Sequence, residues 1–305
     1  MKIKQTTEWV SDIYTYMEGK NPFLIIERNN KVALFNSDGK RVSDWFGMIY
    51  NYGLMEEKSD YFIAKKGKQA IFHKSGKRIS KWFDYIYPEG IVVGKSEYYI
   101  IRENKKEAIF NKKGKQISKW FDIVFPTGLV AGDSDYYEVK ENGKYAIFHQ
   151  KGFQVSEWHD DIKCSGFVRG DNYYYVVREN NLEALFDKDG NNISGWHRFI
   201  IAYSLLCGNT EYFIVERENS TQALFHKSGK QITDWYSGIL GDGIFKGCSE
   251  YFIVEKNFQK AIFNIREGQI TDWYDDIKYE GLVRGNGNFF IAEKNFKKAF
   301  FRVKF

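Results

Sequence analysis

The side chains in this sequence that could do chemistry recur at fixed distances from eight tryptophans. Two positions after a tryptophan stand Asp84, Asp122, Asp160 and Asp275, whose carboxylates could bind cations or act as an acid–base pair. The other four units hold serine, glycine or arginine there, so we interpret the aspartates as turn caps. The five histidines and three cysteines follow no metal-ligand spacing. The sequence therefore predicts a non-enzymatic protein with no metal site and no cofactor.

A second set of ionisable residues falls at the variable position x of a Gly-Φ-Φ-x-Gly pattern, in which Φ is apolar. Glu56, Arg169, Lys246 and Arg284 occupy this position in four units, whereas other units carry valine, alanine or cysteine. Positions that serve structure converge in a repeat, and positions released for binding diverge. Because a buried unpaired charge is costly, we expect these four side chains to reach a solvent-filled axial channel. They form a candidate site for an anionic ligand.

Basic residues concentrate in one quarter of the chain, which we call the basic sector. Residues 59–133 contain 15 Lys and Arg against 8 Asp and Glu, a net charge of +7, whereas the rest of the chain has a net charge of −2. We expect the turn lysines of this sector to be exposed and to bind an acidic protein surface. They are Lys66, Lys68, Lys105, Lys106, Lys112, Lys113 and Lys115. Nucleic acid is the competing partner, but the aromatic residues that would stack on bases lie in expected strands.

A repeat of about 38 residues must position all of these groups. The tryptophans, Trp9 to Trp273, are separated by 36, 37, 38, 38, 38, 39 and 38 residues. An Ala-x-Phe marker also occurs eight times, and in seven cases a tryptophan follows its phenylalanine after ten residues. Trp9 has no marker before it, and Phe301 has no tryptophan after it. The eighth unit is therefore split between the two ends of the chain.

Each unit has the composition of four short strands. In residues 90–124 the expected strands are Gly90–Gly94, Tyr98–Arg102, Glu107–Asn111 and roughly Gln116–Val124. Valine, isoleucine and aromatic residues fill these runs, and Gly, Asn and Lys separate them, which is typical of antiparallel hairpins. No apolar pattern continues for three helical turns.

A four-stranded unit of this length, repeated eight times, predicts an all-β fold, an eight-bladed β-propeller, as a single domain over residues 1–305. We expect residues 7–14 to pair with residues 281–305 and so complete the last blade and close the ring. The alternative is a linear β-solenoid, which should have atypical polar capping repeats, whereas both terminal segments keep the repeat signature.

The tryptophans and paired aromatic residues have a structural and a functional interpretation. A serine or threonine stands two positions before every tryptophan, as in Ser118 and Trp120, and its hydroxyl could bond a nearby backbone group. Paired aromatics such as Tyr61-Phe62 should point to opposite faces of a strand and pack against both neighbouring blades. Because every unit repeats these features, we favour a core role over a ring of platforms for sugars or bases.

The unit at residues 141–170 resembles the bacterial WG-repeat family. The similarity lies in the turn Gln150-Lys151-Gly152, in Asp160-Asp161-Ile162 and in the strand-like Gly166-Phe167-Val168. The Trp-Gly dipeptide of that family is replaced by Tyr145-Ala146. The resemblance implies interaction roles without a shared chemistry. The split last unit also resembles the closure of WD-repeat propellers, whose His, Asp and Trp-Asp signatures are missing.

These observations favour a scaffold that binds a protein partner through a rim or the axial mouth of the ring. The alternatives are a lectin-like module that binds carbohydrate at repeated aromatic sites and, further behind, an enzyme or an anionic-ligand binder with an axial site. The start of the sequence lacks a signal-like apolar stretch, and no apolar run has membrane-spanning length. With three cysteines at unrelated positions, we expect a cytoplasmic protein without a membrane partner.

Overall fold

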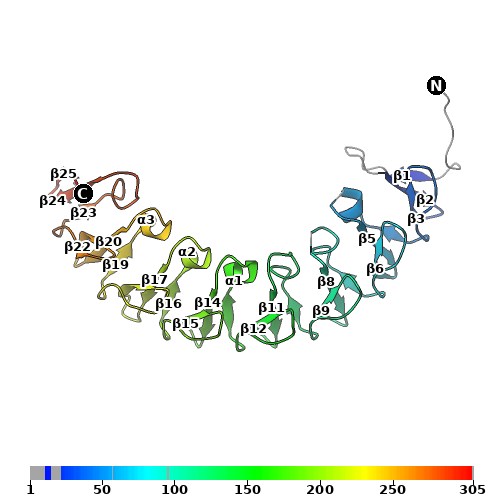
Figure 1. Cartoon of the computed structure of the whole chain (residues 1–305), viewed down its shortest axis with the longest axis horizontal. Helices are drawn as coiled ribbons and strands as arrows, with labels where there is room; N and C mark the ends of the chain where they lie inside the picture. Colours follow the sequence, from blue (N-terminus) through cyan, green and yellow to red (C-terminus); the bar gives the residue numbers. More distant parts are fainter. Residues whose placement is uncertain (1–10, 15–21, 57, 95, 304–305) are drawn as a thin grey trace, which may run out of the picture. The chain divides into compact units, whose positions relative to one another are not determined.

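The computed structural model of the protein (Figure 1) describes residues 11–14, 22–56, 58–94 and 96–303. Within these residues, short antiparallel strands form eight sheets, seven with three strands and one with four. The chain divides into two compact units, Met1–Glu157 and Trp158–Phe305, which contain four sheets each. The all-β repeat architecture is thus confirmed. Closure into a ring and organisation as a single domain stay predictions.

In the first unit, every sheet consists of a short strand followed by a hairpin of two longer strands. The sheets are β1 (Asp12–Tyr14), β2 (Phe23–Arg28) and β3 (Lys31–Asn36); β4 (Met48–Ile49), β5 (Tyr61–Lys66) and β6 (Lys68–His73); β7 (Tyr85–Ile86), β8 (Tyr98–Glu103) and β9 (Lys106–Asn111); and β10 (Ile123–Val124), β11 (Tyr136–Glu141) and β12 (Lys144–His149).

The second unit repeats this arrangement and adds one short fourth strand, β22. Its sheets are β13 (Asp161–Lys163), β14 (Tyr174–Glu179) and β15 (Leu182–Asp187); β16 (Phe199–Ile201), β17 (Tyr212–Glu216) and β18 (Gln222–His226); β19 (Gly238–Leu240), β20 (Tyr251–Lys256), β21 (Gln259–Asn264) and β22 (Gly268–Gln269); and β23 (Asp276–Ile277), β24 (Phe289–Lys294) and β25 (Lys297–Arg302).

The expected fourth strand of each repeat is divided between two sheets. After β9 the chain turns and runs back along this strand, where isolated bridges join Phe110 to Gln116 and Glu107 to Phe121. We call this returning stretch the outer segment. The chain then continues into β10, which pairs with β11 of the next sheet. The two central strands of the repeat match the prediction, since β8 and β9 pair in register from Tyr98 to Glu103.

The prediction that the Gly-Φ-Φ-x-Gly pattern forms an innermost strand is wrong. These segments are short helical turns, either irregular, as at residues 89–93, or regular, as in η1 (Gly53–Glu56), α1 (Ser165–Arg169), α2 (Tyr203–Leu206) and α3 (Asp242–Phe245). The two Φ side chains of a turn are buried, as at Phe167 and Val168, because the helical turn points both toward the sheets. A run of five residues is too short for its apolar spacing to distinguish a strand from one helical turn.

The glycines of this pattern allow successive helical turns to stack closely. A Cβ on Gly166 would lie 1.5 Å from the carbonyl oxygen of Leu206 in the next turn, so no larger residue fits without a shift of the backbone. At other pairs of successive helical turns, a serine hydroxyl forms a hydrogen bond across the contact. Ser96 Oγ donates to the carbonyl oxygen of Leu129 at 2.9 Å, and Ser249 Oγ donates to that of Leu282 at 2.8 Å.

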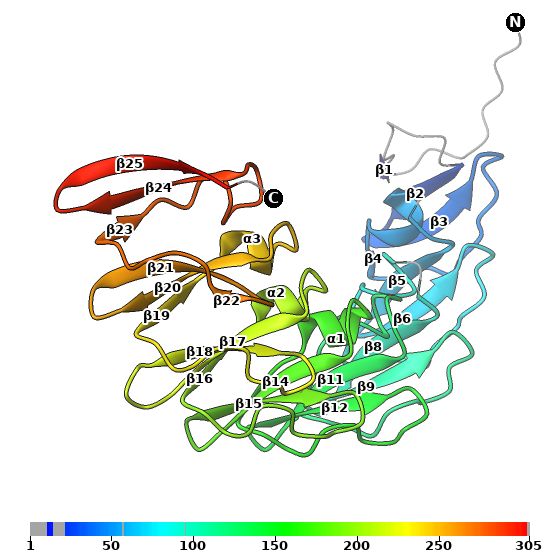
Figure 2. The same cartoon turned by 60° about the vertical axis from the view of Figure 1, so that its left-hand side comes forward.

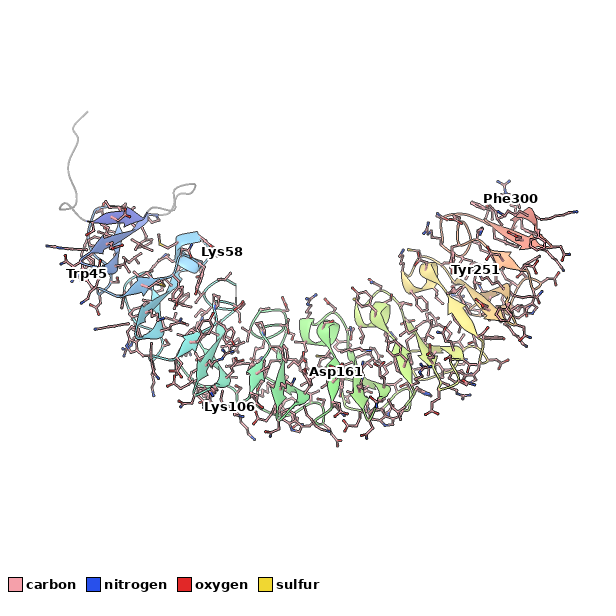
Figure 3. All side chains as sticks on the ribbon, turned by 180° about the vertical axis from the view of Figure 1, so that it is seen from behind. Trp45, Lys58, Lys106, Asp161, Tyr251 and Phe300 are labelled. Atoms are coloured by element: carbon pink, nitrogen blue, oxygen red, sulfur yellow. The ribbon has the colours of Figure 1, made fainter. Side chains whose placement is uncertain are left out.

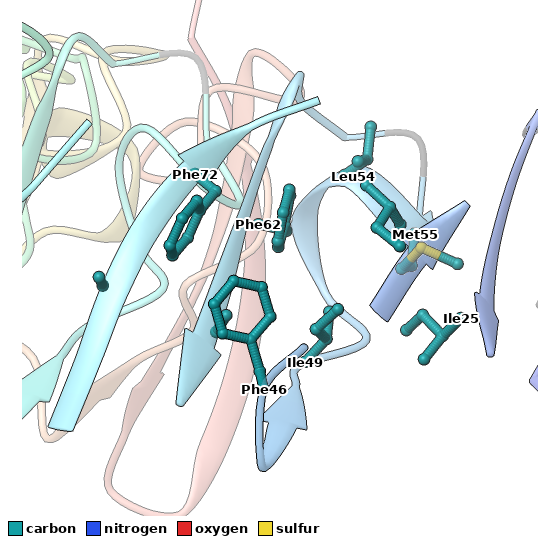
Figure 4. Close-up of a cluster of buried hydrophobic side chains, with 10 residues drawn as sticks. Ile25, Phe46, Ile49, Leu54, Met55, Phe62 and Phe72 are labelled. Carbon is teal, nitrogen blue, oxygen red and sulfur yellow. The ribbon is translucent and has the colours of Figure 1, made fainter. Parts of the chain in front are cut away.

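The hydrophobic core lies between neighbouring sheets, as the paired aromatics predicted. Phe62 packs with Ile25 and Leu34 of the preceding sheet (Figure 4), whereas Ile63, the next residue on β5, packs with Tyr99 of the following sheet. The partly buried Tyr61 also faces the following sheet. Complete burial of one such side chain stabilises the folded state by about 1.5–3 kcal/mol. Almost all of this burial depends on a neighbouring repeat.

The serine or threonine before each described tryptophan fixes the outer segment to the third strand. Ser118 Oγ accepts a hydrogen bond from the backbone N–H of Ile109 at 2.8 Å and donates to the carbonyl of Lys119 at 2.8 Å. The backbone N–H bond recurs in all seven units whose hydroxyl lies in the described residues. The hydroxyls are those of Ser43, Ser80, Ser118, Ser156, Ser194, Thr233 and Thr271. The structural interpretation of these residues is confirmed.

The tryptophans are less buried than a core role requires. Trp120 packs edge-on against Phe110, with ring centroids 6.4 Å apart, and Trp196 packs in the same way against Phe186. Trp120 nevertheless keeps 37% of its surface exposed, and Trp196 keeps 41%. One face of the indole therefore covers the edge of the core, while the other remains in contact with solvent.

The N-terminal strand differs from the expectation for residues 7–14. Residues 12–14 form β1, which pairs with β2 through Asp12↔Glu27, Ile13↔Ile26 and Tyr14↔Ile25. The predicted pairing of residues 7–14 with residues 281–305 stays a prediction, and the structure shows residues 12–14 paired with β2. β1 follows Trp9 as β10 follows Trp120, so it takes the short-strand position of its own sheet. Residues 7–10 lie outside the described residues.

The double hydrogen bond of Ser118 generates a stability prediction. Ser118→Ala leaves the buried N–H of Ile109 without its acceptor, which should cost about 1–3 kcal/mol. Ser118→Thr is the matched control, because Thr233 and Thr271 make the same contact in other repeats. Urea unfolding of both variants measures the difference. Equal midpoints for the alanine variant and the parent would show that the hydroxyl contributes nothing.

Candidate interaction surface

The carboxylates after the tryptophans cap hairpin turns. Asp84 Oδ2 accepts a hydrogen bond from the backbone N–H of Asn104 at 2.9 Å, and Asp122 accepts one from Asn142 at 2.7 Å. Asp160 and Asp275 cap the turns at residues 180 and 295 in the same way. Each of these turn residues has a positive φ, so its N–H points toward the carboxylate of the preceding repeat segment. The turn-cap interpretation is confirmed for all four aspartates.

Two lysines of the basic sector join these caps. Lys106 Nζ lies 2.8 Å from Asp122 Oδ1 and 2.7 Å from Glu141 Oε1, and the N–H of Asp122 donates to the same glutamate. Lys68 makes the equivalent contacts one repeat earlier, with Asp84 and Glu103. Hydrogen bonds from Lys106 and from the N–H of Asn142 hold the pKa of Asp122 below its ordinary value. These lysines therefore connect adjacent repeats.

The structure places the seven predicted lysines at two opposite ends of the sheets. Lys66, Lys68, Lys105 and Lys106 lie at the hairpin turns β5–β6 and β8–β9. The other three, Lys112, Lys113 and Lys115, follow the far end of the six-residue strand β9. At about 3.3 Å per residue, the two groups are separated by the length of this strand. The seven residues do not form one surface.

The second group belongs to a larger set of exposed cations on two neighbouring repeats. We define this basic strip as Lys77, Arg78, Lys81, Lys113, Lys115 and Lys119, all of which are exposed. The residues lie in the turns after β6 and β9 and in the outer segments that run back along these strands. Within the described residues, no ion pair neutralises any of the six. Lys112, which lies beside the strip, is paired with Glu97.

The charge of the strip is confined to these two repeats. In the repeat before them, the corresponding segment carries Lys40 and Arg41 together with Asp38 and Asp44. In the repeat after them, Glu157 stands at the position of Lys81 and Lys119. Because the bridge from the third strand to the outer segment recurs in all four repeats, the fold does not require the lysines.

The four predicted axial residues lie in or beside the helical turns and are exposed. In the second unit, Lys246 pairs with Asp242 at 2.9 Å, and Arg284 approaches the same carboxylate at 3.7 Å. Hydrogen bonding to Lys246 lowers the pKa of Asp242. Arg169 follows the buried part of α1. In the first unit, Glu56 pairs with Lys58 at 2.8 Å. Asp242 thus neutralises part of the positive charge that the sequence assigned to an anion site.

Two buried glutamates, Glu107 and Glu183, were not predicted from the sequence as structural residues. Glu107, 1% exposed, accepts hydrogen bonds from Arg102, from the hydroxyl of Tyr87 and from the backbone N–H of Val124. Glu183 makes the same backbone contact two repeats later, with Ile200 at 2.9 Å. One sequence signal could have indicated this role. Other repeats also carry a long polar side chain at this position, namely Gln69 and Gln222. Each side chain ties its own sheet to the short strand of the next.

No cluster of three or more metal-ligating side chains occurs among the described residues. None of the three cysteines, Cys164, Cys207 and Cys248, forms a disulfide with another described residue. No helix in the described ranges is long and apolar enough to cross a membrane.

The chain matches no protein-family model and no curated protein. Three solved structures illustrate what it is similar to. A eukaryotic initiation factor aligns with a TM-score of 0.35 at 8% identity, covering 89% of this chain and 90% of its own. The C-terminal WD40 domain of Sif2 gives 0.27 at 8% identity, covering 93% and 94%. Kluyveromyces lactis Hsv2 gives 0.30 at 11% identity, covering 89% of each. Similarity at this level establishes neither a shared fold nor a shared function, and the WG-repeat resemblance is not confirmed.

The contacts of Lys106 predict a pH-dependent effect on stability. Lys106→Met keeps the aliphatic stem but removes the ammonium, so the pKa of Asp122 should rise toward its ordinary value and Tm should fall at neutral pH. Because the folded-state pKa is lowered, the stabilisation is present above the unfolded pKa of Asp122. It is lost as the pH falls through the folded value, so the Tm difference from the parent should shrink in strong acid.

The exposed neighbour Lys105 supplies the control for this measurement. Lys105→Met removes a charge at the same hairpin but breaks no ion pair of the described residues. Its Tm should follow that of the parent at both neutral and acidic pH. A pH-independent Tm difference for Lys106→Met would assign the effect to packing and contradict the electrostatic account.

Proposed function

We propose that this protein is a non-enzymatic scaffold that binds an acidic protein partner through the basic strip. The observation that carries the proposal is the set of six exposed cations, without ion pairs in the described residues, on two adjacent repeats. Elsewhere in the basic sector, Lys68 and Lys106 are held by carboxylates of their own chain. Cations without internal partners retain their field for an incoming molecule, which raises the association rate.

We favour a protein partner over nucleic acid or a sugar, because the exposed cations without ion pairs in the strip are confined to two adjacent repeats. Trp120, beside Lys119, keeps 37% of its surface exposed, so a base could stack on its open face, and the RNA comparison below tests this alternative. A lectin should present its aromatic sites in repeat after repeat, whereas the strip is defined on two. The three cysteines form no disulfide among the described residues, which supports a cytoplasmic location.

The proposal predicts that reversal of two strip charges weakens partner binding several-fold. Lys81→Glu combined with Lys119→Glu places acids where Asp44 and Glu157 stand in the flanking repeats, so folding should be unaffected. Binding should weaken mainly through a slower association rate, and more at low salt than at high salt, because the Debye length is about 8 Å at physiological ionic strength. The partner is first captured from the native host with the parent protein, and binding is then measured by surface plasmon resonance.

Two comparisons decide the assignment. Lys66→Glu with Lys105→Glu reverses two exposed charges at the opposite end of the sheets and should leave binding unchanged. A single-stranded RNA probe should bind more weakly than the captured protein. If the strip variant binds as the parent does, or if RNA binds more tightly than any protein, the proposed docking surface is wrong.

We also propose that the eight repeats close into a propeller through residues 4–10. The sequence KQTTEWV at this position corresponds to KQISKWF at 115–121, an outer segment that lies along a third strand. In the last sheet, the face of β25 that such a segment would cover is exposed. Ala299 and Phe300 on β25 are exposed, and the side chain of Phe300 (labelled in Figure 3) is 63% exposed. Ala108 and Ile109, at the same positions of β9, are fully buried. The exposed face of β25 supports this proposal.

Deletion of residues 1–10 tests the closure and leaves β1 in place. Loss of Trp9 and of the hydroxyl of Thr7 should lower Tm and promote aggregation through the exposed β25 edge. Trp9→Ala should reproduce much of this effect, and deletion of residues 1–3 should not. Thermal denaturation and light scattering follow the variants. If the ten-residue deletion has the Tm of the parent, these residues do not complete the last sheet.

A further inference from the structure

Two phenylalanines occupy backbone positions that normally exclude them. Phe258 and Phe296 are the second residues of the two-residue turns that join β20 to β21 and β24 to β25. Their φ angles are 62° and 60°, and those of the preceding Asn257 and Asn295 are 52° and 51°. This is the left-handed region, where a bulky side chain is a rare outlier. Both phenylalanines are almost fully exposed, at 92% and 97%.

The corresponding turns of other repeats show that the fold does not call for phenylalanine. Asn30, Asn181 and Gly143 stand at this position in three repeats, and both residue types tolerate a positive φ. Lys105, which occupies it in a fourth repeat, is polar. Phenylalanine costs backbone strain and exposes an apolar ring to water without a packing gain. An outlier with this cost points to a role outside the folding of the chain.

The two rings lie at the same end of adjacent sheets. The sheets of β20 and β24 share a hydrophobic cluster that contains Ile253, Ile262 and Phe290, so they pack face to face, about 10 Å apart. Figure 2 shows both hairpin turns projecting on the same side of the unit. Phe258 has a sheet on each side and is exposed all the same. Its exposure is therefore not a consequence of lying at the end of the chain.

Lysines flank both rings. Lys256 lies two residues before Phe258, and Lys294 and Lys297 lie on either side of the turn at Phe296. All three are exposed, and no ion pair within the described residues involves them. Farther from the tips, Lys260 is neutralised by Asp276 at 2.7 Å, and Lys298 approaches Glu293 at 4.0 Å. The immediate surroundings of the two rings are thus apolar at the tip and positive at the base.

We propose that these two aromatic turns insert into the interface of an anionic lipid bilayer. Each turn would place one ring among the acyl-chain ends, while the lysines at its base contact negatively charged headgroups. The exposure of the two rings, 92% and 97%, together with the lysines at their bases, favours an anionic lipid surface as the partner. The expectation that the protein has no membrane partner rested on the lack of long apolar runs. Single phenylalanines in turns do not form such runs. The inference does not rest on the proposed protein partner.

Vesicle flotation with the full chain tests the inference. The parent should bind vesicles of phosphatidylcholine and phosphatidylserine, and should bind pure phosphatidylcholine much more weakly. Phe258→Asn with Phe296→Asn introduces the residue that Asn30 and Asn181 supply in other repeats. This double variant should retain or raise Tm, because asparagine tolerates the positive φ, and should lose about tenfold or more of the vesicle affinity.

Three further variants separate the possible sources of binding. Tyr203→Asn removes an aromatic ring of 76% exposure on α2 and should bind as the parent does. Lys256→Gln with Lys294→Gln and Lys297→Gln should weaken binding to anionic vesicles in a salt-dependent manner. Lys81→Glu with Lys119→Glu, which tests the basic strip, should retain most of the vesicle affinity.

The inference fails if the double asparagine variant floats with anionic vesicles as the parent does. It also fails if the basic-strip variant alone abolishes flotation, since the lipid would then bind the strip. If the parent binds no vesicles but loses a captured protein partner in the double asparagine variant, the rings occupy a protein pocket and the membrane assignment is wrong.

Discussion

No sheet of this protein can bury both of its faces alone, and the rest of the structure follows from that limitation. Each sheet has two strands of five or six residues and a short third one, which is below the size that is stable in isolation. Ile63 and Phe62 point to opposite neighbours, so a sheet with a neighbour on each side within its unit contributes half of two cores. The chain must therefore pass from sheet to sheet without leaving unpaired backbone groups. The hydroxyls of Ser118 and its equivalents meet this need where the outer segment leaves its sheet.

The charged residues divide into those that join repeats and those that remain available. Lys106 and the buried Glu107 start the same strand, yet both are occupied by partners in neighbouring segments. Lys113 and Lys119 lie in the next turn and outer segment and have no such partners among the described residues. A count of charges along the sequence treats these four residues alike. Only the directions of the side chains distinguish a lysine that stabilises the stack from one that can attract another molecule.

The central hairpins were predictable because each strand combines β-branched and aromatic residues with turn residues at both ends. The Gly-Φ-Φ-x-Gly turns were not, since five residues contain neither two periods of a helix nor a polar face that would mark a strand. The reason for Gly166 is also non-local, because the atom that excludes a side chain there is the carbonyl of Leu206 in the next repeat. Glu107 looked like a solvent-facing residue. Its partners Tyr87 and Val124 lie in the repeat segments before and after it, beyond the range of any local pattern.

The candidate surfaces differ from the rest of the molecule in their side chains, which change between repeats although the backbone conformation stays the same. A position that keeps the same φ and the same hydrogen bonds in several repeats imposes the same demands on its side chain. Where Asp44 and Glu157 are replaced by Lys81 and Lys119, the change cannot be a requirement of the fold. Phe258 extends this argument, because it departs from the repeat against the backbone preference as well. A substitution that adds strain in two adjacent repeats, and exposes the ring in both, is better explained by contact with another phase or molecule than by the stability of the chain.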